Sequence, residues 1–476
     1  MRLVAALTAL TLTPATAPAQ ADAPRWQPCG PDGQVCTTVR VPVDWARPGQ
    51  GALTLRVARL PATGERRGSV LYLPGGPGKD GIQQLEEARA VLAGLRRGFD
   101  VVTFETRYQK TMALPQPSCA ASAPLLTEPR DRADFARQAA ALKQLAVKCA
   151  ADGGGLIAHA DSASAARDAD AVRRLLGERR VGITAESYGG ITATAYARLF
   201  PGRVSALHLD STVDLTRPVR FGTAAEEMFD RFAAWCAANP SCRLHGQDVR
   251  AVWRELITRA DADPFPGPGG ARLTGFHLQM AATGFVVPGN WPAFAEAVAK
   301  ARDGDASDFA MQSAGLSGMA SQPKNRAAWC GDGFGLRTYR DYLRTREESL
   351  ADSPSFGRAG TWLGLICSGW PYRPPNPPRP IPGDRLPAAL GTASWTDYQA
   401  TSSLAGRIPG SVTVRQDGPG HVLYVSGASP CVARHVENYF LRGELPAAGT
   451  LCPAVTAGDR GRGAATPQPR DGSPRG

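Results

Sequence analysis

The sequence is poor in the features that mark several large classes of protein. It contains no lysine-rich run, no zinc-finger pattern and no RNA-binding signature, although 54 Lys+Arg against 43 Asp+Glu give it a net charge of +11. The excess is mostly scattered arginine, which does not make the concentrated basic footprint of a nucleic-acid-binding protein. Internal repeats are absent, and no stretch after the N-terminus is long and apolar enough to span a membrane. We therefore expect neither a nucleic-acid partner nor a membrane span.

The composition is that of a folded chain with many turns. Its 476 residues fit one large domain with insertions, or two domains. Hydrophobic residues make up 43% and charged residues 20%, which allows a sizeable core and excludes a fully disordered chain. The 52 glycines and 40 prolines follow no collagen period, so they indicate turns and loops.

The N-terminus has the three parts of a secretory signal peptide. Arg2 supplies a short positive region, Leu3 to Leu12 is apolar, and Ala19-Gln20-Ala21 is a small-x-small cleavage site. The apolar run is too short to cross a hydrocarbon core of roughly 30 Å. We expect residues 1–21 to be removed after Ala21 and the protein to be secreted, to the extracellular or periplasmic space.

The ten cysteines are expected to form disulfides, because export permits them. There is no C-x₂-C pair and no histidine beside two cysteines at ligand spacing, so no metal site is expected. Sequence alone cannot prove connectivity. Short loops close at the least entropic cost, so neighbour pairing is the default. The pairs are Cys29 with Cys36, Cys119 with Cys149, Cys236 with Cys242, Cys330 with Cys367, and Cys431 with Cys452.

Apolar strands alternate with helices in the first half of the chain. Such alternation predicts an α/β fold with a mostly parallel sheet and helices on both faces. Residues 37–41 and 52–60 alternate, and 52–60 does so like a half-buried strand, whereas 69–73 is fully apolar and 99–104 reads as another buried strand. The predicted strands are 37–41, 52–60, 69–73, 99–104, 181–184 and 204–209, and the predicted helices are 164–176 and 191–200.

The pattern changes near residue 215 and returns near 386. Residues 215–371 read as a mainly helical insertion with a Pro/Gly break at 263–270, and 374–382 as a stiff, polyproline-like connector. A strand at 386–390, a helix at 398–407 and a strand at 412–414 follow. We therefore divide the chain into a first core part (22–214), a helical cap (215–371), a C-terminal core part (372–456) and a disordered tail (457–476).

The segment Ala185-Glu186-Ser187-Tyr188-Gly189-Gly190 lies between an apolar strand and a helix. This is the context of a nucleophile elbow, whose tight turn lifts a serine hydroxyl above the edge of the sheet. The usual pattern is G-x-S-x-G, and here Ala185 replaces the first glycine. Ser187 is the predicted nucleophile. The alternative is a serine that only caps the following helix.

The loop Gly75-Gly76-Pro77-Gly78 follows an earlier strand. It can bring a backbone N–H beside the nucleophile without a side-chain clash. Together with the Tyr188 N–H, the Gly76 N–H would form a two-donor oxyanion hole, and Gly75 is the alternative donor. A phosphate-binding loop is disfavoured because the G-K-[ST] ending is missing.

Among six histidines, His421 is the predicted general base. The base of such a site follows the last strand of the sheet, and only His421 does so, in Gly418-Pro419-Gly420-His421. His435, on the following helix, reads as a surface or packing residue. His208, within a buried strand, reads as a core residue.

The acid that orients the imidazole has two candidates. Asp397 is the one carboxylate in the loop after the penultimate strand, but it also stands where a helix begins and could serve as its N-cap. Asp210, at the end of the strand after the nucleophile helix, is the alternative acid. The residues leave this choice open.

The chain resembles the secreted tripeptidyl-aminopeptidase-like α/β hydrolases of actinobacteria and related bacteria, the peptidase group that includes proline iminopeptidases. The resemblance covers most of residues 26 to 453. The matching segments are Cys29 and Cys36 with Val41-Pro42-Val43-Asp44, the 75–78 loop, Glu186-Ser187-Tyr188-Gly189-Gly190, Cys330-Gly331-Asp332, Phe356-Gly357, Cys367-Ser368-Gly369-Trp370-Pro371, Pro409-Gly410-Ser411 leading to Gly420-His421, Cys431, Tyr439, Gly443-Glu444-Leu445-Pro446 and Cys452.

The resemblance implies an α/β-hydrolase fold with an inserted helical cap, and a serine exopeptidase that releases short N-terminal fragments. Two segments depart from the family: residues 105–111 retain only Arg107 of the usual D-x-R-G-x-G-x-S, and the position of the family's catalytic aspartate is Ala393. An esterase or amidase of the same mechanism, and a catalytically impaired homologue that only binds peptides, therefore stay as alternatives.

We expect a peptide or small acyl substrate, no cofactor, since acyl transfer by serine needs none, and a monomer. An exopeptidase would need a carboxylate for the free amino group of its substrate. Glu226, Glu227 and Glu186 are the candidates, and the sequence does not choose among them.

Overall fold

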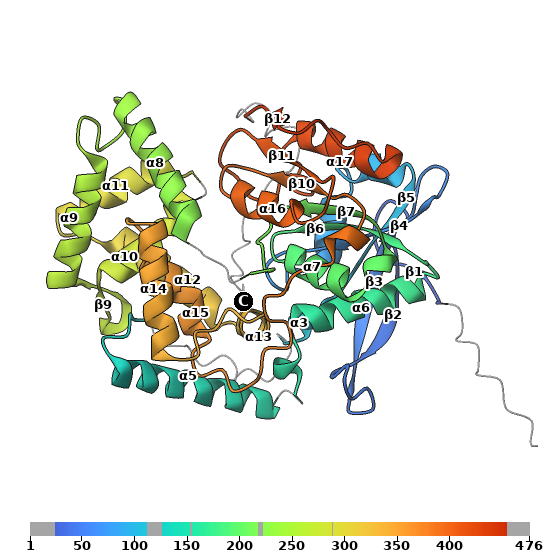
Figure 1. Ribbon diagram of the computed structural model, residues 1–476, viewed down its shortest axis with the longest axis horizontal. Coiled ribbons are helices and arrows are strands. Elements are labelled where there is room, and N and C mark those ends of the chain that lie inside the picture. Colours follow the sequence, from blue (N-terminus) through green and yellow to red (C-terminus); the bar gives the residue numbers. More distant parts are fainter. Residues whose placement is uncertain (1–23, 112–125, 153–154, 218–221, 288, 455–476) are drawn as a thin grey trace, which may run out of the picture.

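The computed structural model describes residues 24–111, 126–152, 155–217, 222–287 and 289–454. Figure 1 shows two regions: a sheet flanked by helices, and a group of helices beside it that contains α8 to α12, α14 and α15. The predicted signal peptide 1–21 and tail 457–476 lie outside the described residues. Among the described helices, none is both long and apolar enough to cross a membrane.

The sheet is antiparallel at one edge and parallel across the rest. Its described strands lie in the order β1-β2-β3-β5-β4-β6-β7-β10-β11-β12. Pairing is antiparallel from β1 to β5 and parallel from β5 to β12. The strands are β1 (Gln27–Pro28), β2 (Val35–Pro42), β3 (Ala52–Leu60), β4 (Gly68–Leu73), β5 (Phe99–Phe104), β6 (Val181–Glu186), β7 (Val204–Asp210), β10 (Leu390–Ala393), β11 (Val412–Gln416) and β12 (Leu451–Cys452).

Helices cover both faces of the sheet because its strands are apolar on both sides. In β4, Leu71 and Leu73 pack with one cluster of buried residues, whereas Val70 and Tyr72 pack with another. The first cluster holds side chains of α6 (Ser162–Leu175), α7 (Gly189–Leu199) and α16 (Tyr398–Ala405). The second holds those of α1 (Gly81–Glu87) and α17 (Pro430–Arg442), and α2 (Ala93–Arg96) packs on the same side. The predicted two-sided α/β fold is thus confirmed.

The cap has its own aromatic core. Phe229, Phe232, Phe294, Phe309 and Phe356 are buried together around Trp253. The cap helices are α8 (Gly222–Ala238), α9 (Val249–Ala262), α10 (Gly275–Val286), α11 (Trp291–Arg302), α12 (Ser307–Ser321), α13 (Pro323–Gly331), α14 (Tyr339–Asp352) and α15 (Trp362–Ile366), with a small antiparallel pair of β8 (Phe265–Pro266) and β9 (Arg272–Leu273).

Two local features differ from the sequence-based expectation. The strand expected at 386–390 begins only at Leu390 and runs to Ala393, because the residues before it approach the sheet without ladder pairing. Helix α5 (Arg132–Asp152), which we assigned to the first core part, packs against the cap through Phe135, which contacts Tyr339 and Tyr342 of α14.

Four of the five expected cysteine pairs are disulfides in the structure. They join Cys29 to Cys36, Cys236 to Cys242, Cys330 to Cys367, and Cys431 to Cys452. The fifth expected pair includes Cys119, which lies outside the described residues.

Candidate active site

Ser187 occupies a tight turn between β6, which ends at Glu186, and α7, which begins at Gly189. Its φ of 50° is in the left-handed region, which a residue with a side chain adopts only when its surroundings enforce it. The backbone does so here, since the Ser187 N–H donates to the Asp210 carbonyl at 2.9 Å. The predicted elbow conformation is therefore present.

Two glycines let the chain close around this turn. A Cβ on Gly189 would stand 2.1 Å from the Leu73 carbonyl oxygen, so no larger residue fits where helix and strand meet. A Cβ on Gly75 would stand 2.8 Å from the Ser187 Cβ. The 75–78 loop therefore lies directly against the serine because its first residue has no side chain.

The structure brings His421 to Ser187 and Asp397 to His421. The Nε2 atom of His421 lies 2.8 Å from the Ser187 Oγ, and its Nδ1 atom lies 2.8 Å from the Asp397 Oδ2. The His421 side chain is 52% exposed, whereas that of Asp397 is 18% exposed. These three residues come from loops that follow β6, β10 and β11, which end at the same edge of the parallel sheet.

Asp397 does not cap the helix that it precedes. It stands at the N-cap position of α16, but its side chain accepts no backbone hydrogen bond there. Its carboxylate is turned to His421 instead. Ala393, where the family carries its aspartate, is buried at the end of β10. Asp397 lies four residues after Ala393, beyond the edge of the sheet, and from there its carboxylate reaches the imidazole of His421.

Asp210, the alternative acid, has a different place. Its Oδ2 accepts the N–H groups of Leu423 and Tyr424 at 2.8 Å each, and the Ser211 hydroxyl donates to Oδ1. Both ring nitrogens of His421 are already matched by Asp397 and Ser187. The structure therefore places Asp210 under the loop that follows His421, not on the ring.

That loop is held in a strained conformation. Val422 has a φ of 60°, which is unusual for a β-branched residue. Its N–H donates to the Ser211 Oγ at 3.0 Å, and the two following N–H groups are bound by Asp210. Ser211 itself has a φ of 52°. Sequence reasoning gave Ser211 no role, and only its position after the candidate Asp210 could have drawn attention to it.

The backbone around the serine offers candidate oxyanion donors. Tyr188 stands at the N-cap position of α7, so its N–H is at the positive end of the helix. The Gly75 N–H faces the Glu186 carboxylate, with Oε1 at 3.4 Å. This contact engages the Gly75 amide and leaves Gly76 the better candidate of the two.

The ionisable groups of the site are strongly influenced by their surroundings. Desolvation lowers the pKa of His421, but the hydrogen bond and charge of Asp397, with the charges of Asp210 and Glu186, raise the pKa above its usual value. Burial raises the pKa of Asp210 to about 6, although the backbone N–H groups that it accepts act against the shift. His208 is in the core as expected, between Thr184 and Thr392, and burial lowers its pKa to about 3.

A buried polar network lies beside the nucleophile. The Tyr188 hydroxyl donates to the Asp332 Oδ2 at 2.5 Å, and Asp332 also accepts from the Ser162 hydroxyl and N–H. Burial, followed by the charge of Asp161, raises the pKa of Asp332 to about 7. Asp332 belongs to a segment that carries the family resemblance, but sequence gave it no role. Its network fixes the side chain of the residue that follows Ser187.

The three candidate carboxylates for a substrate amino group have different surroundings. Glu226 accepts from the Ser353 hydroxyl and from the N–H and hydroxyl of Ser355, and Glu227 pairs with Arg231 at 3.0 Å. Glu186 is buried, with Oε1 facing Gly75 and Gln84, whereas its Oε2 has no hydrogen-bond partner among the described residues. The choice among the three carboxylates stays open.

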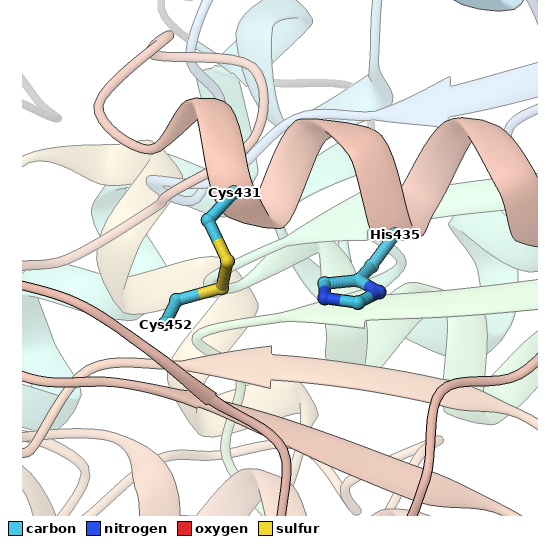
Figure 2. Close-up of side chains that lie close together, drawn as sticks. All are labelled: Cys431, His435 and Cys452. Carbon is cyan, nitrogen blue, oxygen red and sulfur yellow. A yellow bond between two sulfur atoms is a disulfide. The ribbon is translucent and has the colours of Figure 1, made fainter.

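One set of possible metal ligands appears among the described residues. Cys431, His435 and Cys452 place their ligand atoms within 4.8 Å of one another. Figure 2 shows that the two sulfurs are joined in a disulfide, with the imidazole of His435 beside it. The expectation that no histidine stands beside two cysteines is wrong for the folded chain. Helix α17 carries Cys431 and His435, and β12 brings Cys452 next to them. A disulfide has no thiolate to offer a metal.

Comparison with known proteins matches both halves of the site. A family described as "alpha/beta hydrolase fold" matches residues 68–260, which include Ser187, and one described as "TAP-like protein" matches residues 353–452, which include Asp397 and His421. A tripeptidyl aminopeptidase of Streptomyces lividans is 28% identical over 466 residues, covering 90% of this chain and 86% of the relative. The chain has an α/β-hydrolase fold and is similar to the tripeptidyl aminopeptidases.

Two further relatives of this α/β hydrolase carry different names. The serine protease Hip1 of Mycobacterium tuberculosis is 27% identical over 480 residues and covers 90% of each chain. The carboxylesterase B of Mycobacterium tuberculosis is 28% identical over 471 residues, covering 88% of this chain and 86% of the relative. The names of these relatives are those of hydrolases, one of them a serine protease, and this chain is a serine hydrolase.

Proposed function

We propose that this hydrolase is an exported exopeptidase that releases short fragments from the N-terminus of peptides through an acyl-enzyme. The observation that carries the proposal is the continuous contact from Asp397 through His421 to Ser187, with 2.8 Å at each step. The names of the tripeptidyl aminopeptidase and serine protease relatives support a peptide as the substrate.

In acylation, the Ser187 oxygen attacks the scissile carbonyl carbon while the His421 Nε2 accepts the serine proton. The imidazolium then gives this proton to the leaving amine as the C–N bond breaks. Asp397 accepts the Nδ1–H throughout, which holds the ring in the tautomer whose Nε2 is a base. The N–H groups of Tyr188 and Gly76 would bind the oxygen that becomes negative. Water repeats the sequence in deacylation and frees Ser187.

Two other readings compete with the peptidase. An esterase of the same mechanism is favoured by the relative named carboxylesterase B. A catalytically impaired homologue is suggested by Ala393, but the contact between Asp397 and His421 supplies the carboxylate that Ala393 lacks. The contact supports an active enzyme. Experiment has to decide whether the leaving group is an amine, as in a peptidase, or an alcohol, as in an esterase.

Labelling with a fluorophosphonate tests the mechanism. We expect wild type to be labelled covalently and folded Ser187→Ala not to be labelled, because the serine oxygen is the atom that attacks phosphorus. An unlabelled wild type, or a labelled Ser187→Ala, would contradict the assignment. A panel of tripeptidyl, aminoacyl and acyl-ester reporters then separates peptidase from esterase by the ratio of kcat/KM values.

We further propose export through a signal peptide of residues 1–21 and action as a monomer. Four disulfides among the described residues support an oxidising destination. Expression of the full gene product in a secreting host, followed by intact-mass analysis of the medium, should give a chain that begins at Asp22. Sedimentation of that chain should give the mass of one copy.

A further inference from the structure

The loop that carries Asp397 sends a tryptophan into the cap. Trp395 stands two residues before Asp397, yet its partly buried ring packs against the aromatic core of the cap. Every other hydrophobic residue of that cluster lies between Ala225 and Phe356. The acid loop, residues 394–397, is therefore packed on the cap as well as on the sheet.

The contacts of Trp395 come from two cap helices. The ring of Trp291, at the start of α11, is stacked with that of Trp395 at an interplanar angle of 10° and a centroid distance of 6.5 Å. The guanidinium of Arg231, on α8, lies 4.2 Å from the centroid of the Trp395 ring. A cation over an indole ring is attracted by the negative face of the ring. The tryptophan is thus held by both stacking and charge.

A second contact runs from the next residue to the cap. The Thr396 hydroxyl donates to the Val287 carbonyl at 3.0 Å, at the C-terminal end of α10. On the core side, the Trp395 indole N–H donates to the Asp417 Oδ1 at 3.0 Å, and its backbone N–H donates to the Gly418 carbonyl at 3.1 Å. Asp417 and Gly418 belong to the loop of His421. The acid loop therefore lies between the cap and the base.

We propose that Trp395 is a positioning residue through which the cap holds Asp397 against His421; this rests on the proposed function. The described ladder of β10 ends at Ala393, so Asp397 is beyond the reach of the strand hydrogen bonds that would fix an acid at the strand end. Its loop is held by the side chains of residues 395 and 396, by the Trp395 N–H bond to Gly418, and by α16, whose Thr401 N–H donates to the Asp397 carbonyl at 2.9 Å. A substrate that shifts the cap thereby changes the orientation of the base, and so affects kcat as well as KM.

The test compares three variants. Trp395→Ala removes the ring from the cap, Trp395→Phe keeps a ring but loses the bond to Asp417, and Trp253→Phe perturbs the cap core away from the acid loop. Trp253 is buried among Phe229, Phe294 and Phe356, and it serves as the control for loss of cap stability alone.

Two readouts are measured on the full chain. The first is the rate of fluorophosphonate labelling, and the second is the pKa of His421 from imidazole nitrogen shifts in histidine-labelled protein, assigned with His421→Asn. The charged groups that act on this ring are Asp397, Asp210 and Glu186, and only Asp397 is attached to the loop of Trp395. Loss of contact with Asp397 therefore lowers the pKa of His421.

We expect Trp395→Ala to label roughly 10- to 100-fold more slowly and to lower the pKa of His421. Trp395→Phe should keep most of the wild-type labelling rate and most of the wild-type pKa of His421, because its ring still packs on Trp291. Trp253→Phe should lower the unfolding midpoint and leave both readouts unchanged. A folded Trp395→Ala with the wild-type rate and pKa would overturn the proposal, as would an equal pKa change in Trp253→Phe. Failure of the proposed function shows differently: wild type would not label, whereas the pKa comparison would still report on the contact.

Discussion

The sheet core of this hydrolase has a fully buried ion pair beside its apolar clusters, whereas the helical cap is built around an aromatic cluster. The core contains buried charge: Arg107 and Asp168, both fully buried, share two hydrogen bonds of 2.6 Å. The cap contains stacked and edge-to-face rings, such as Phe294 against Phe229, Phe232 and Trp253. Charge pairs and backbone bonds are directional, whereas apolar contacts are not.

This difference extends to the candidate site. Ser187 and the loop of His421 are positioned by core backbone, through the Asp210 carbonyl and the N–H groups that Asp210 accepts. Asp397 is positioned by a loop that packs on the cap. The comparison teaches that two members of one constellation can be fixed within one region, while the loop of the third is bonded and packed to both.

The largest effect on the reaction rate is expected from removing the carboxylate charge of Asp397, whose loop contacts both the core and the cap. Asp397→Asn should lower the rate of fluorophosphonate labelling, or kcat/KM for an ester reporter, roughly 10⁴-fold, because an amide favours the wrong imidazole tautomer. The free energy of unfolding should change little, since the carboxylate caps no helix. Chemical denaturation measured alongside the kinetics checks this.

Asp210→Asn is the matched core variant for that experiment. It should lower the free energy of unfolding by about 1–3 kcal/mol, because both N–H groups that the Asp210 Oδ2 accepts lose their charged partner. Its effect on rate should be smaller than that of Asp397→Asn. The reverse order would show that Asp210 acts on the imidazole and that the observed contact of Asp397 is not the one used.

Substitutions in the buried pair of Arg107 and Asp168 test how much the core depends on directional bonds. Arg107→Met should cost about 3–5 kcal/mol of unfolding free energy, because the Asp168 charge is left buried without its partner. Adding Asp168→Leu should recover a large part of that loss. Urea denaturation of the two variants measures both values.

Phe294→Ala provides the corresponding change in the cap. It should also cost about 3–5 kcal/mol, through a cavity in the aromatic core. No second truncation should rescue it, because apolar contacts have no partner whose removal relieves a charge. If a neighbouring truncation such as Phe229→Ala did restore stability, the contrast between the two regions would be wrong.

The pH dependence should separate the site from the cap. The reaction needs a neutral His421, and its pKa is raised, so the rate should fall about tenfold per pH unit below that raised pKa. His277, in the cap, has a pKa lowered to about 4 by burial and stays neutral over the same range. Rates and tryptophan fluorescence measured from pH 8 to 5 should therefore show activity loss before any change in the cap.

The smallest expected difference lies between two disulfides. Cys236 and Cys242 in the cap are separated by 6 positions, and Cys431 and Cys452 in the core by 21. Loop-closure entropy then gives about 2 and about 3 kcal/mol of stabilisation, respectively. Paired Cys→Ala variants should differ by about 1 kcal/mol in unfolding free energy, and equal losses would show that closure entropy does not decide the effect.

Sequence predicted the core elements well because their apolar patterns are local. The strands at 52–60 and 99–104 have the predicted bounds, and the elbow around Ser187 was recognisable from its flanking strand and helix. The choice between Asp397 and Asp210 was not local: it depends on which carboxylate the fold turns toward His421. The packing of Trp395 on the cap was equally invisible, since its partners lie more than 100 residues away in the chain.

The start of α16 shows what this use of Asp397 excludes. An aspartate at an N-cap ordinarily satisfies one of the free amides of the first helical turn, a contribution of about 1 kcal/mol. Here the backbone of Asp397 is already helical, with φ −107° and ψ −4°, and the carboxylate serves the imidazole instead. The same side chain cannot do both. The contact with His421 therefore leaves the first turn of α16 without a side-chain cap.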